Sequence, residues 1–388
     1  MTQQVINFGL IGCGLMGREF ASAVGRWFHL RNLAVRPQIV AVCDPDPAAR
    51  QWFTENVPSV RWAVERHEDL LSEASVHAVY CAVPHNLHSA LYTDILSAGK
   101  HLIGEKPFGI DLPANRQINR AIEQHPQLLV RCSSEMPFFP GAFQIARLVT
   151  AGQFGRIIEV ESGLWHSSDL NPEKPINWKR RIATCGEYGV LGDLGMHALH
   201  LPLRFGWRPR NVRAVLTKIV THRPDGCGGV VPCETWDNAT LLCSACDADG
   251  NEFPLSISTK RIAPGHNNTW FLRIIGTRLS AEYSTRYPKQ LLTLPYDRPG
   301  ATQSWHHTDV AYETAYPTIT GSIFEFGFSD AILQMWAAYC DELAHGRQNM
   351  RQPLYCATPA EAAETHRIFT AALQSQAQQA TIALNQPA

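Results

Sequence analysis

Residues 5–17 read VINFGLIGCGLMG, an apolar run that leads directly into a turn containing Gly12, Gly14 and Gly17. The run has the length and composition of a buried β-strand, and apolar residues recur at helical spacing after the turn. Glycines in this pattern allow a tight turn and let backbone N–H groups approach a pyrophosphate at the positive end of a helix. A strand, a G-x-G-x-x-G turn and a helix in succession therefore predict dinucleotide binding.

The next apolar run, residues 38–43, ends at Asp44. An acid at the end of the second strand can accept hydrogen bonds from both ribose hydroxyls of an adenosine, and its charge repels a 2′-phosphate. Pro45 stands where a nearby arginine would favour NADP, so the expected cofactor is NAD. Asp44 also opens an Asp-Pro-Asp-Pro turn, and the alternative is that it has only this role.

Two further strand patterns, residues 76–83 and 101–104, end at short polar segments. The first leads into PHNLH at 84–88, and the second into Glu105-Lys106-Pro107. Ligands of open α/β sheets bind beyond the carboxyl ends of the strands, where Lys106 can reach a carbon that reacts above a nicotinamide. Its ammonium group can donate to a substrate oxygen and stabilise an alkoxide. The alternative is an ordinary surface lysine at a strand end.

A glycine-rich segment lies near the middle of the chain, where residues 186–200 read GEYGVLGDLGMHALH. Leucines at helical spacing predict an α-helix, and offsets of four and three bring Asp193, His197 and His200 to one face. A carboxylate beside an imidazole forms a general-base pair, because the acid fixes the ring tautomer and favours the protonated ring. The alternative is an amphipathic helix whose histidines lie in a polar seam.

Composition excludes several classes of protein. The chain has 388 residues, 45% hydrophobic and 18% charged, with a formal net charge of −1. We therefore expect two globular domains and no basic surface for nucleic acid or an anionic membrane. No run approaches the roughly 18 apolar residues of a membrane span, and the N-terminus lacks the pattern of a signal peptide.

The eleven cysteines favour reduced thiols and a cytoplasmic location over a disulfide framework. Cys243 and Cys246, with Cys227 and Cys233 upstream, raise the alternative of a zinc site. The strand pattern of residues 237–246 disfavours that alternative.

Together these motifs resemble, in order, those of the Gfo/Idh/MocA family of oxidoreductases. The resemblance rests on Gly12–Gly17, Asp44, AVPHNLH at 82–88, AGKH at 98–101, Glu105-Lys106-Pro107 and Asp193-Leu-Gly-Met-His197. It implies an α/β + α+β fold, with a doubly wound Rossmann domain over residues 1–132 followed by an open, mostly antiparallel β-sheet domain over residues 133–388.

The rest of the chain agrees with this organisation. Strand patterns occur at residues 157–161, 213–220, 239–246, 254–260, 271–275 and 291–294. Residues 329–343 and 359–373 predict amphipathic helices that return toward the first domain, whereas 226–232 predict a surface loop and 374–388 a fraying tail. Family members commonly cover such a sheet by pairing subunits, so the resemblance implies a homodimer or homotetramer.

The resemblance also implies roles for individual residues. Lys106, Asp193 and His197 would be catalytic, and Lys106, His197 and His200 would contact a carbohydrate substrate. The cofactor NAD would be bound by Gly12, Gly14, Leu15, Met16, Gly17, Asp44, Val83, Pro84, His88, Glu105, Lys106 and Trp178.

Two positions depart from the family pattern. Trp178-Lys179 stands where relatives have a Trp-Arg or similar pair; with Arg180 and Arg181, Lys179 forms three successive cations that either bind an anionic substituent of the substrate or lie in a solvated loop. His200 stands where many relatives have an acid, which changes the contact with a substrate hydroxyl. Separately, HNNT at 266–269 either reaches sugar hydroxyls or is only a turn.

The motifs and the resemblance predict an NAD-dependent oxidoreductase acting on a CH–OH group of a sugar, a sugar derivative or a cyclitol, with His197 taking the hydroxyl proton. One alternative is an NAD-dependent glycosidase. There, transient oxidation of a ring hydroxyl acidifies the neighbouring C–H, elimination expels the aglycone, water adds to the product, and the NADH formed at the start reduces the sugar again. Tyr188 would be an additional acid or base there, or else a packed aromatic. A non-catalytic NAD sensor would lack the lysine or the histidine. A metal enzyme built on His197-x-x-His200 has no evident third ligand, so no metal is expected.

Overall fold

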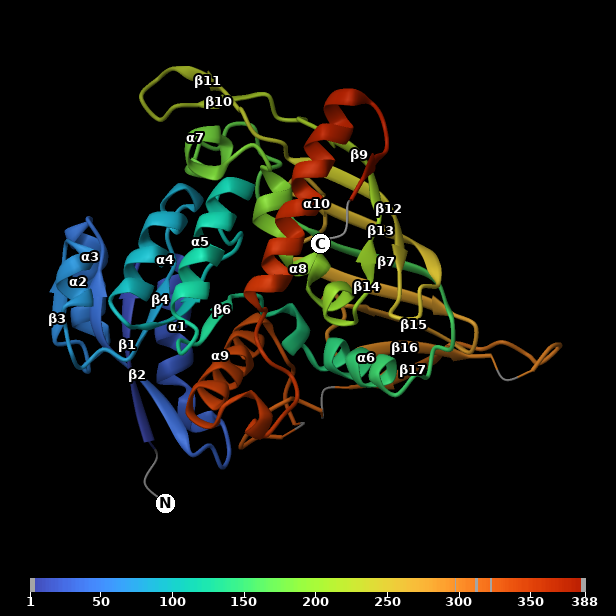
Figure 1. Cartoon of the computed structure of the whole chain (residues 1–388), viewed down its shortest axis with the longest axis horizontal. Coiled ribbons are helices and arrows are strands. Elements are labelled where there is room, and N and C mark those ends of the chain that lie inside the picture. Colours follow the sequence, from blue (N-terminus) through green and yellow to red (C-terminus); the bar gives the residue numbers. More distant parts are fainter. Residues whose placement is uncertain (1–3, 297, 311–312, 322, 385–388) are drawn as a thin grey trace. The chain divides into compact units, whose positions relative to one another are not determined.

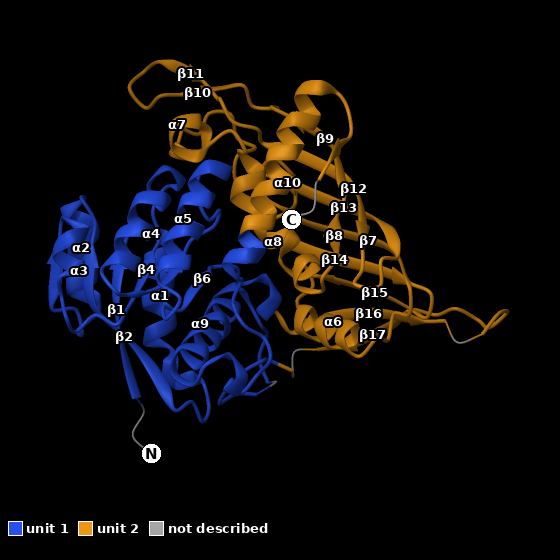
Figure 2. Ribbon diagram, viewed as in Figure 1, with its two compact units in different colours: residues 1–138, 314–362 blue, residues 139–313, 363–388 orange. Residues whose placement is uncertain are grey.

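The computed structural model, described over residues 4–296, 298–310, 313–321 and 323–384, divides the chain into two compact units (Figure 2). Unit 1 contains Met1–Phe138 and Thr314–Ala362, and unit 2 contains Phe139–Glu313 and Ala363–Ala388. The sequence predicts two contiguous domains, 1–132 and 133–388. The structure differs because residues 314–362 belong to the first unit.

A parallel six-stranded sheet forms the centre of unit 1, in the order β3-β2-β1-β4-β5-β6 (Figure 1). Its strands are β1 (Gln4–Ile11), β2 (Val35–Cys43), β3 (Trp62–Val64), β4 (Ala78–Cys81), β5 (His101–Gly104) and β6 (Val130–Cys132). Strands covered on both faces require continuous apolar runs, which this sequence has. The chain order reverses beside β1, where a doubly wound sheet binds its ligand. The predicted Rossmann domain is confirmed.

Helices connect and cover these strands. They are α1 (Leu15–Gly25), η1 (Trp27–His29), α2 (Pro47–Asn56), α3 (His67–Leu71), η2 (His85–Leu87), α4 (His88–Ser97), α5 (Leu112–Gln124), η3 (Met136–Phe138), α9 (Phe328–His345) and η5 (Arg347–Asn349). Helix α1 packs against α9, and α4 packs against α5. The α2 and α5 helices begin with aspartate caps that accept a backbone N–H, which satisfies one of the donors left free at a helix start.

Helix α9 completes the core of unit 1. Trp336 stacks on Phe20 of α1 with ring centroids 3.8 Å apart. Its ring also meets the edges of two aromatic rings on the sheet, Phe8 and Tyr80. This packing explains why a segment so late in the chain belongs to the first unit, and it confirms the predicted return of residues 329–343.

An open sheet of ten strands forms most of unit 2, in the order β17-β16-β15-β14-β7-β13-β12-β9-β18, with β8 paired to β12. Among the described residues of this sheet, only β7 and β13 pair in parallel. The strands are β7 (Ile157–Trp165), β8 (Arg208–Pro209), β9 (Asn211–Thr217), β12 (Asn238–Cys246), β13 (Glu252–Lys260), β14 (Thr269–Gly276), β15 (Leu279–Ser284), β16 (Gln290–Pro295), β17 (His306–Asp309) and β18 (Ile382–Ala383). The predicted mostly antiparallel sheet is confirmed.

Three parts of unit 2 differ from the sequence-based expectation. Strand β15 carries no recognised pattern, since its burial is mixed. The expected loop 226–232 ends in β11 (Val230–Pro232), which pairs with β10 (His222–Pro224). The expected fraying tail is wrong as far as residue 384, because α10 (Pro359–Gln378) continues through it and β18 then pairs with β9. Most of α10 belongs to unit 2, so its predicted return to the first domain is not confirmed.

Helix α8 (Val190–Arg204) lies on the buried face of this sheet, and every residue from Val190 to Leu203 is buried. Pro202 inside the helix cannot donate to the carbonyl of Ala198. Ser162 of β7 compensates, because its hydroxyl donates to that carbonyl at 2.7 Å. Gly195 is required by packing, since a Cβ atom there would lie 2.5 Å from the ring of Phe369. The remaining helices of unit 2 are α6 (Pro140–Thr150), η4 (Trp178–Arg180) and α7 (Ile182–Cys185).

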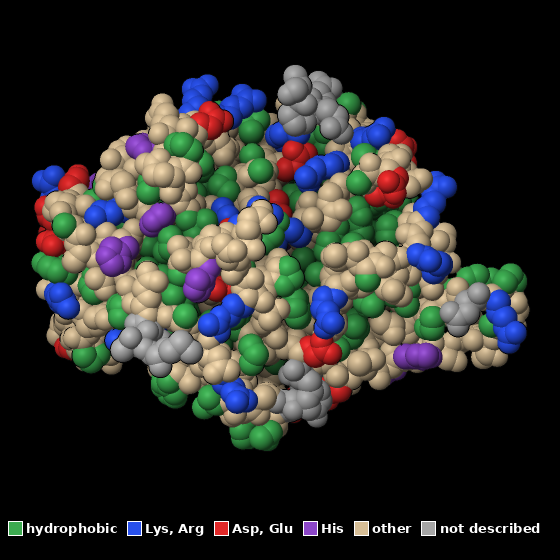
Figure 3. Space-filling model, turned by 60° about the horizontal axis from the view of Figure 1, so that its bottom comes forward, with side chains coloured by type: hydrophobic (Ala, Val, Ile, Leu, Met, Phe, Trp, Pro, Cys, Tyr) green, Lys and Arg blue, Asp and Glu red, His purple; other side chains and the backbone are tan. Residues whose placement is uncertain are grey.

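Charges of both signs are interspersed among polar and apolar atoms on the face that Figure 3 shows. This distribution agrees with the formal net charge of −1. A single-sign surface of the kind that attracts nucleic acid does not occur among the described residues on that face. Within the described part of the chain, none of the helices is long and apolar enough to cross a membrane.

A buried ion pair should contribute far more to stability than an exposed one. Arg131 of β6 donates to both carboxylate oxygens of Glu342 in α9, whose side chain is 1% exposed. Arg131→Met would leave that carboxylate buried without a cation, so we expect the free energy of unfolding to fall by about 3 to 5 kcal/mol. Arg147→Met is the matched control: its pair with Glu313 has side chains 58% and 52% exposed, and its loss should cost less than about 1 kcal/mol. Calorimetric unfolding of both variants measures this difference, and equal losses would contradict it.

Candidate active site

The glycine-rich turn after β1 has the geometry that a dinucleotide requires. Gly12 has a φ of +96°, and a Cβ atom there would lie 2.3 Å from the carbonyl oxygen of Ala82. A Cβ atom at Gly17 would lie 2.5 Å from the Gly12 carbonyl oxygen. Gly14 caps the start of α1 and has no atom within 4 Å of where a Cβ would be. The N–H groups at the start of α1 are therefore open to a phosphate.

Asp44 lies against this turn. Its Oδ2 accepts a hydrogen bond from the Cys13 N–H at 2.8 Å, and its Oδ1 accepts one from the Asp46 N–H at 2.9 Å. Strand β2 pairs with β1 so that Cys43 is opposite Ile11, which brings the acid beside the glycines. A carboxylate at this place fits the ribose of NAD, because it accepts hydroxyl hydrogen bonds and repels a 2′-phosphate.

Other residues expected to bind the cofactor have mixed surroundings. Leu15 is 75% exposed at the start of α1, whereas Met16 is half-buried. Val83 and Pro84 follow β4 and are half-buried, and the close approach of Ala82 to Gly12 places their turn beside the glycine turn. These positions agree with the expected role.

The position of the His88 ring does not agree with the expected contact to the cofactor. It is completely buried, with Nδ1 2.6 Å from the carbonyl oxygen of Pro107 and Nε2 3.0 Å from that of Val83. Burial lowers the pKa of His88 to about 4, so at neutral pH the ring has a single N–H, which donates to one of the two carbonyl oxygens while the ring packs against the other. The ring therefore holds the segments after β4 and β5 together, and the expectation that it contacts the cofactor is corrected.

Glu105 is also enclosed by protein, with 7% exposure. Its Oε1 accepts a hydrogen bond from the Tyr80 hydroxyl at 2.7 Å, and its carbonyl oxygen accepts one from the Tyr92 hydroxyl at 2.8 Å. Glu105 thus anchors the chain where it leaves β5, and its contact with NAD stays a prediction. The next residue, Lys106, is half-buried.

A second acid near Lys106 has no counterpart in the sequence-based prediction. Glu135 is 4% exposed and follows β6, the strand beside β5. Gly104 and Cys132 are opposite each other in the two strands, and the Ser133 N–H donates to the Gly104 carbonyl at 2.8 Å. The pKa of Glu135 is raised from 4.5 to about 7, mainly by burial and in part by the charge of Glu105, while a backbone hydrogen bond and Lys106 oppose the change. Glu135 could have been found from the sequence only by predicting that β5 and β6 are parallel neighbours, because the residues after such strands lie at the same edge of the sheet.

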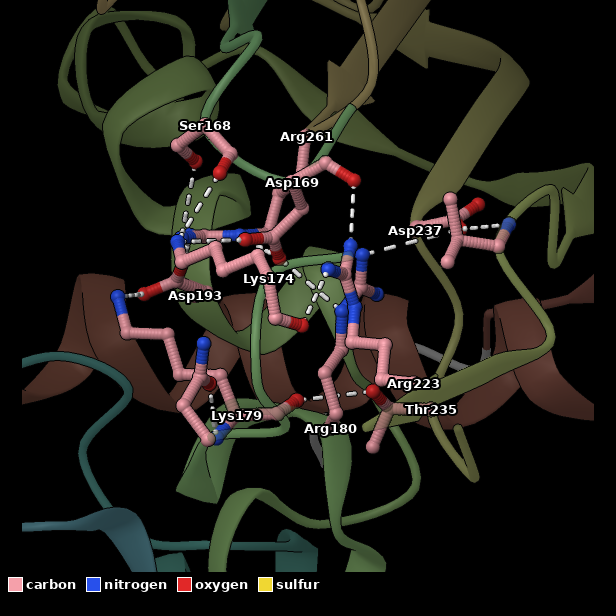
Figure 4. A network of polar contacts seen from close by, with 12 residues as sticks. Ser168, Asp169, Lys174, Lys179, Arg180, Asp193, Arg223, Thr235, Asp237 and Arg261 are labelled. Carbon is pink, nitrogen blue, oxygen red and sulfur yellow. Dashed lines mark hydrogen bonds and ion pairs between the residues drawn. The ribbon is translucent and has the colours of Figure 1, made fainter. Parts of the chain in front are cut away.

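In unit 2, helix α8 carries the acid and the histidines of the predicted general-base pair. Asp193 is 1% exposed, and His197, one turn later, is 5% exposed. The Asp193 carboxylate is bound by two cations: Lys179 donates to Oδ1 at 2.9 Å, and Arg261 donates to Oδ2 (Figure 4). The Trp270 indole donates to the His197 carbonyl at 3.0 Å and fixes that turn of the helix.

Two predicted substrate contacts are corrected by burial. His200 is completely buried, and Arg204 donates to its Nε2 at 2.9 Å. Arg180 is also completely buried, with Nε 3.0 Å from Asp169 and Nη2 3.7 Å from Asp237. Neither side chain can reach a bound molecule without a rearrangement. Of the two, Arg180 therefore has a structural role in the charge network of Figure 4.

Trp178 and Lys179 lie in η4, where the Lys179 ammonium is 5.4 Å from the centroid of the Trp178 ring. The Lys179 side chain is 27% exposed while it contacts Asp193. It is therefore the member of the cationic run that combines accessibility with a contact to the predicted acid.

Tyr188 is a packed aromatic. Its side chain is 3% exposed, its hydroxyl lies 2.7 Å from the Thr370 hydroxyl, and its ring meets the edges of His366 and Phe369. The role of an additional acid or base, considered for the glycosidase alternative, is corrected on this ground. The packed alternative describes the residue.

Two family models match the amino-acid sequence of this chain. The model of the oxidoreductase family with an NAD-binding Rossmann fold, GFO_IDH_MocA, matches residues 6–131. The model of the GFO/IDH/MocA C-terminal domain matches residues 143–282. The chain belongs to the Gfo/Idh/MocA family. Its family resemblance, its fold class and its NAD-binding domain are therefore confirmed.

Curated relatives of this Gfo/Idh/MocA protein include dehydrogenases. Levoglucosan dehydrogenase of Pseudarthrobacter phenanthrenivorans is 24% identical over 341 residues, which cover 84% of this chain and 82% of that protein. Inositol 2-dehydrogenase of Corynebacterium glutamicum is 26% identical over 153 residues, which cover 39% of this chain and 43% of that protein.

Solved structures share the whole fold. A levoglucosan dehydrogenase in complex with NADH and L-sorbose has a TM-score of 0.86 at 19% identity, covering 99% of this chain and 100% of that one. An oxidoreductase domain protein from Kribbella flavida has a TM-score of 0.86 at 21% identity, covering 100% of both chains. At these identities the likeness establishes the fold.

Replacing Asp44 by alanine should shift the cofactor preference from NADH toward NADPH. The change removes the charge that repels a 2′-phosphate, while Arg50, whose Nη1 lies 2.5 Å from the Asp44 carbonyl oxygen, stays nearby. We expect the ratio of the NADPH to the NADH dissociation constant to fall at least about tenfold in fluorescence titrations. Asp46→Ala is the matched control, because Asp46 caps α2 through the Ala48 N–H. Its loss should cost about 1 kcal/mol of stability and leave the ratio unchanged. An unchanged ratio in Asp44→Ala would remove this role.

The buried acid Glu135 should make stability fall as pH rises. Its pKa is raised from 4.5 to about 7 in the folded protein, so between these values the folded state holds a proton that the unfolded state has released. Glu135→Gln cannot ionise, so its stability relative to the original protein should rise over this window by up to about 3 kcal/mol and then level off. Melting temperatures from pH 4 to pH 8 measure the difference. Glu55→Gln, an exposed acid of α2, should give a flat difference, and a flat difference in both variants would contradict the expectation.

Proposed function

We propose that this protein oxidises a CH–OH group of a sugar, a sugar derivative or a cyclitol by transferring a hydride to NAD. The observation that carries this proposal is the Asp193 carboxylate, buried one helical turn before His197 and held by two cations, in a chain with an NAD-binding domain. The names of two relatives, levoglucosan dehydrogenase and inositol 2-dehydrogenase, support the substrate class.

Each proposed residue has a separate task. His197 takes the hydroxyl proton, and Asp193 orients the imidazole and stabilises its protonated form. Lys106 donates from its ammonium group to the same oxygen, which lowers the cost of an alkoxide. NAD, when bound, supplies the hydride acceptor, while the chain supplies placement and charge. The proposal requires that Lys106 act on the same carbinol as the residues of α8.

Neutral polar groups after β7 and in the loop 266–269 support a hydroxyl-rich substrate. The Ser167 hydroxyl donates to the side-chain oxygen of Asn267 at 3.1 Å, which joins the end of β7 to the loop 266–269. The Trp165 and His266 rings meet edge to face with centroids 4.8 Å apart. Amides, hydroxyls and an aromatic face are groups that bind sugars, so we propose that this loop contacts substrate hydroxyls.

The glycosidase alternative receives less support. It needs a further acid or base, and Tyr188, the side chain considered for that task, is 3% exposed and bonded to Thr370. The curated relatives named above are dehydrogenases. Release of phenol from aryl glycosides without accumulation of NADH would nevertheless favour the glycosidase.

We also propose that the protein is a cytoplasmic homo-oligomer. All eleven cysteines are free thiols, and ten of them are buried, which suits a reducing compartment. Val215 of β9 and Leu242 of β12 are 56% and 55% exposed on the face of the sheet opposite the buried residues. Pairing of two subunits over this face would cover them.

Substitution of the proposed catalytic residues should greatly lower turnover while the protein still binds NAD. The purified protein is screened against sugars, uronates, sulfosugars, inositols and aryl glycosides, with NADH followed at 340 nm. Lys106→Ala and His197→Ala should each lower kcat at least about 100-fold, because each removes a group that acts on the transferring proton or the developing charge. The NADH affinity of the His197→Ala variant should stay within about twofold of the original.

Lys218→Ala and His222→Ala serve as controls of the same residue types. Lys218 lies over the Trp236 ring, and His222 is exposed on β10. Both variants should retain their turnover. Near-normal turnover in either Lys106→Ala or His197→Ala would refute the role assigned to that residue.

A further inference from the structure

The Asp193 carboxylate is held from two sides. Lys179 of η4 donates to one oxygen, and Arg261, which directly follows β13, donates to the other. The side chain of Arg261 is only 10% exposed, whereas that of Lys179 is 27% exposed. Arg261 is therefore the better fixed of the two cations.

Arg261 is itself immobilised by a second acid. Its Nε lies 3.0 Å from Oδ2 of Asp169, and its Nη2 donates to the Ser168 hydroxyl at 3.2 Å. Both acids thus bind the same guanidinium group, whose planar shape fixes the angle between them. A lysine at this position could not bridge them in the same way, since its ammonium is a point charge.

Asp169 is completely buried and stays ionised. Burial raises its pKa, but Arg261, Arg180 and Lys174 together outweigh this effect and hold the pKa below its usual value. Lys174 lies 3.2 Å and Arg180 3.0 Å from the carboxylate. A buried carboxylate with three cations is expensive to desolvate, so simple stability is a poor explanation for the cluster.

The rest of the network anchors these charges to the backbone. Arg180 also faces Asp237, whose carboxylate accepts hydrogen bonds from the Ile219 and Val220 N–H groups. Arg223 donates to the carbonyl oxygens of Asn171, Lys174 and Asp169, which hold the loop after β7. Arg223 is buried like Arg261, but these three hydrogen bonds go to backbone carbonyl oxygens and not to a carboxylate.

We propose that Arg261 is a positioning residue that sets the orientation of Asp193, and that Asp169 holds Arg261 in place for this purpose. The catalytic part of this proposal rests on the proposed function of Asp193 and His197. With a cation facing each oxygen, the Asp193 carboxylate has a fixed orientation, and the substrate proton goes to the imidazole. The charged and titratable groups that face Asp193 include Lys179 of η4, Arg261 after β13 and His166 after β7, and His197 follows on α8.

The test compares Arg261→Met with Arg261→Lys in steady-state kinetics from pH 5 to pH 10. Arg261→Met should lower kcat by about 100-fold, because a misplaced acid leaves the base poorly oriented. It should also move the ascending limb of kcat/KM to higher pH by on the order of one unit, since loss of a nearby cation favours binding of the proton. Arg261→Lys keeps the charge, so the limb should stay in place and kcat should fall only about tenfold.

Arg223→Met is the matched control. It removes a second buried arginine from the same network without touching Asp193. It should lower the melting temperature but leave the ascending limb where it is. If both methionine variants lose similar kcat and neither moves the limb, Arg261 is merely structural and the proposal is overturned.

A second measurement needs no substrate. The melting-temperature loss caused by Arg261→Met is measured in the original protein and in Asp193→Asn, and it should be several degrees smaller in the second background. Equal losses mean that Arg261 does not hold Asp193, which overturns the proposal whether or not a substrate is found. Unequal losses in a protein that turns over no compound of the panel would refute the proposed function and leave the Arg261–Asp193 contact established.

Discussion

The burial of charge is the constraint on which the arrangement of unit 2 depends. Asp193 is 1% exposed and Asp169 is completely buried, and carboxylates in such surroundings are stable only when cations face them. The cations come from separate segments, Lys179 from η4 and Arg261 from the end of β13. Compensation of these charges therefore joins the loop after β7 and the end of β13 to helix α8, which carries His197.

In unit 1, neutral and aromatic groups hold the segments that follow the strands. The segments after β4 and β5 are tied together by His88, a neutral ring between two carbonyl oxygens, and by Glu105 under the Tyr80 hydroxyl. These enclosed residues leave Lys106 half-buried beside them. The glycine turn and Asp44 lie at the same sheet edge, because parallel strands bring their carboxyl ends together. The glycine turn, Asp44 and Lys106 therefore all follow strands of the same parallel sheet.

Local patterns predicted most of the elements but misassigned several side chains. The apolar runs of β1, β2, β5 and α8 were recognisable because burial on both faces or along one helix demands them. His88, Glu105, Arg180 and His200 carry motifs or charges that look functional, yet each is enclosed and bonded to protein. Exposure depends on which distant segments cover a residue, so a motif cannot reveal it.

The amino-acid sequence alone determined the Rossmann domain, the NAD-type acid Asp44 and the helical spacing of Asp193 and His197, because glycine geometry, strand burial and helix periodicity act over a few residues. Tertiary structure decided three contacts. Helix α9 packs into unit 1 through Trp336. Strand β6, which leads to Glu135, pairs with β5, which leads to Glu105. Arg261 binds the Asp193 carboxylate. These are contacts between residues far apart along the chain. Their energy comes from packing and from charge compensation in a buried environment, which exists only once the chain has folded.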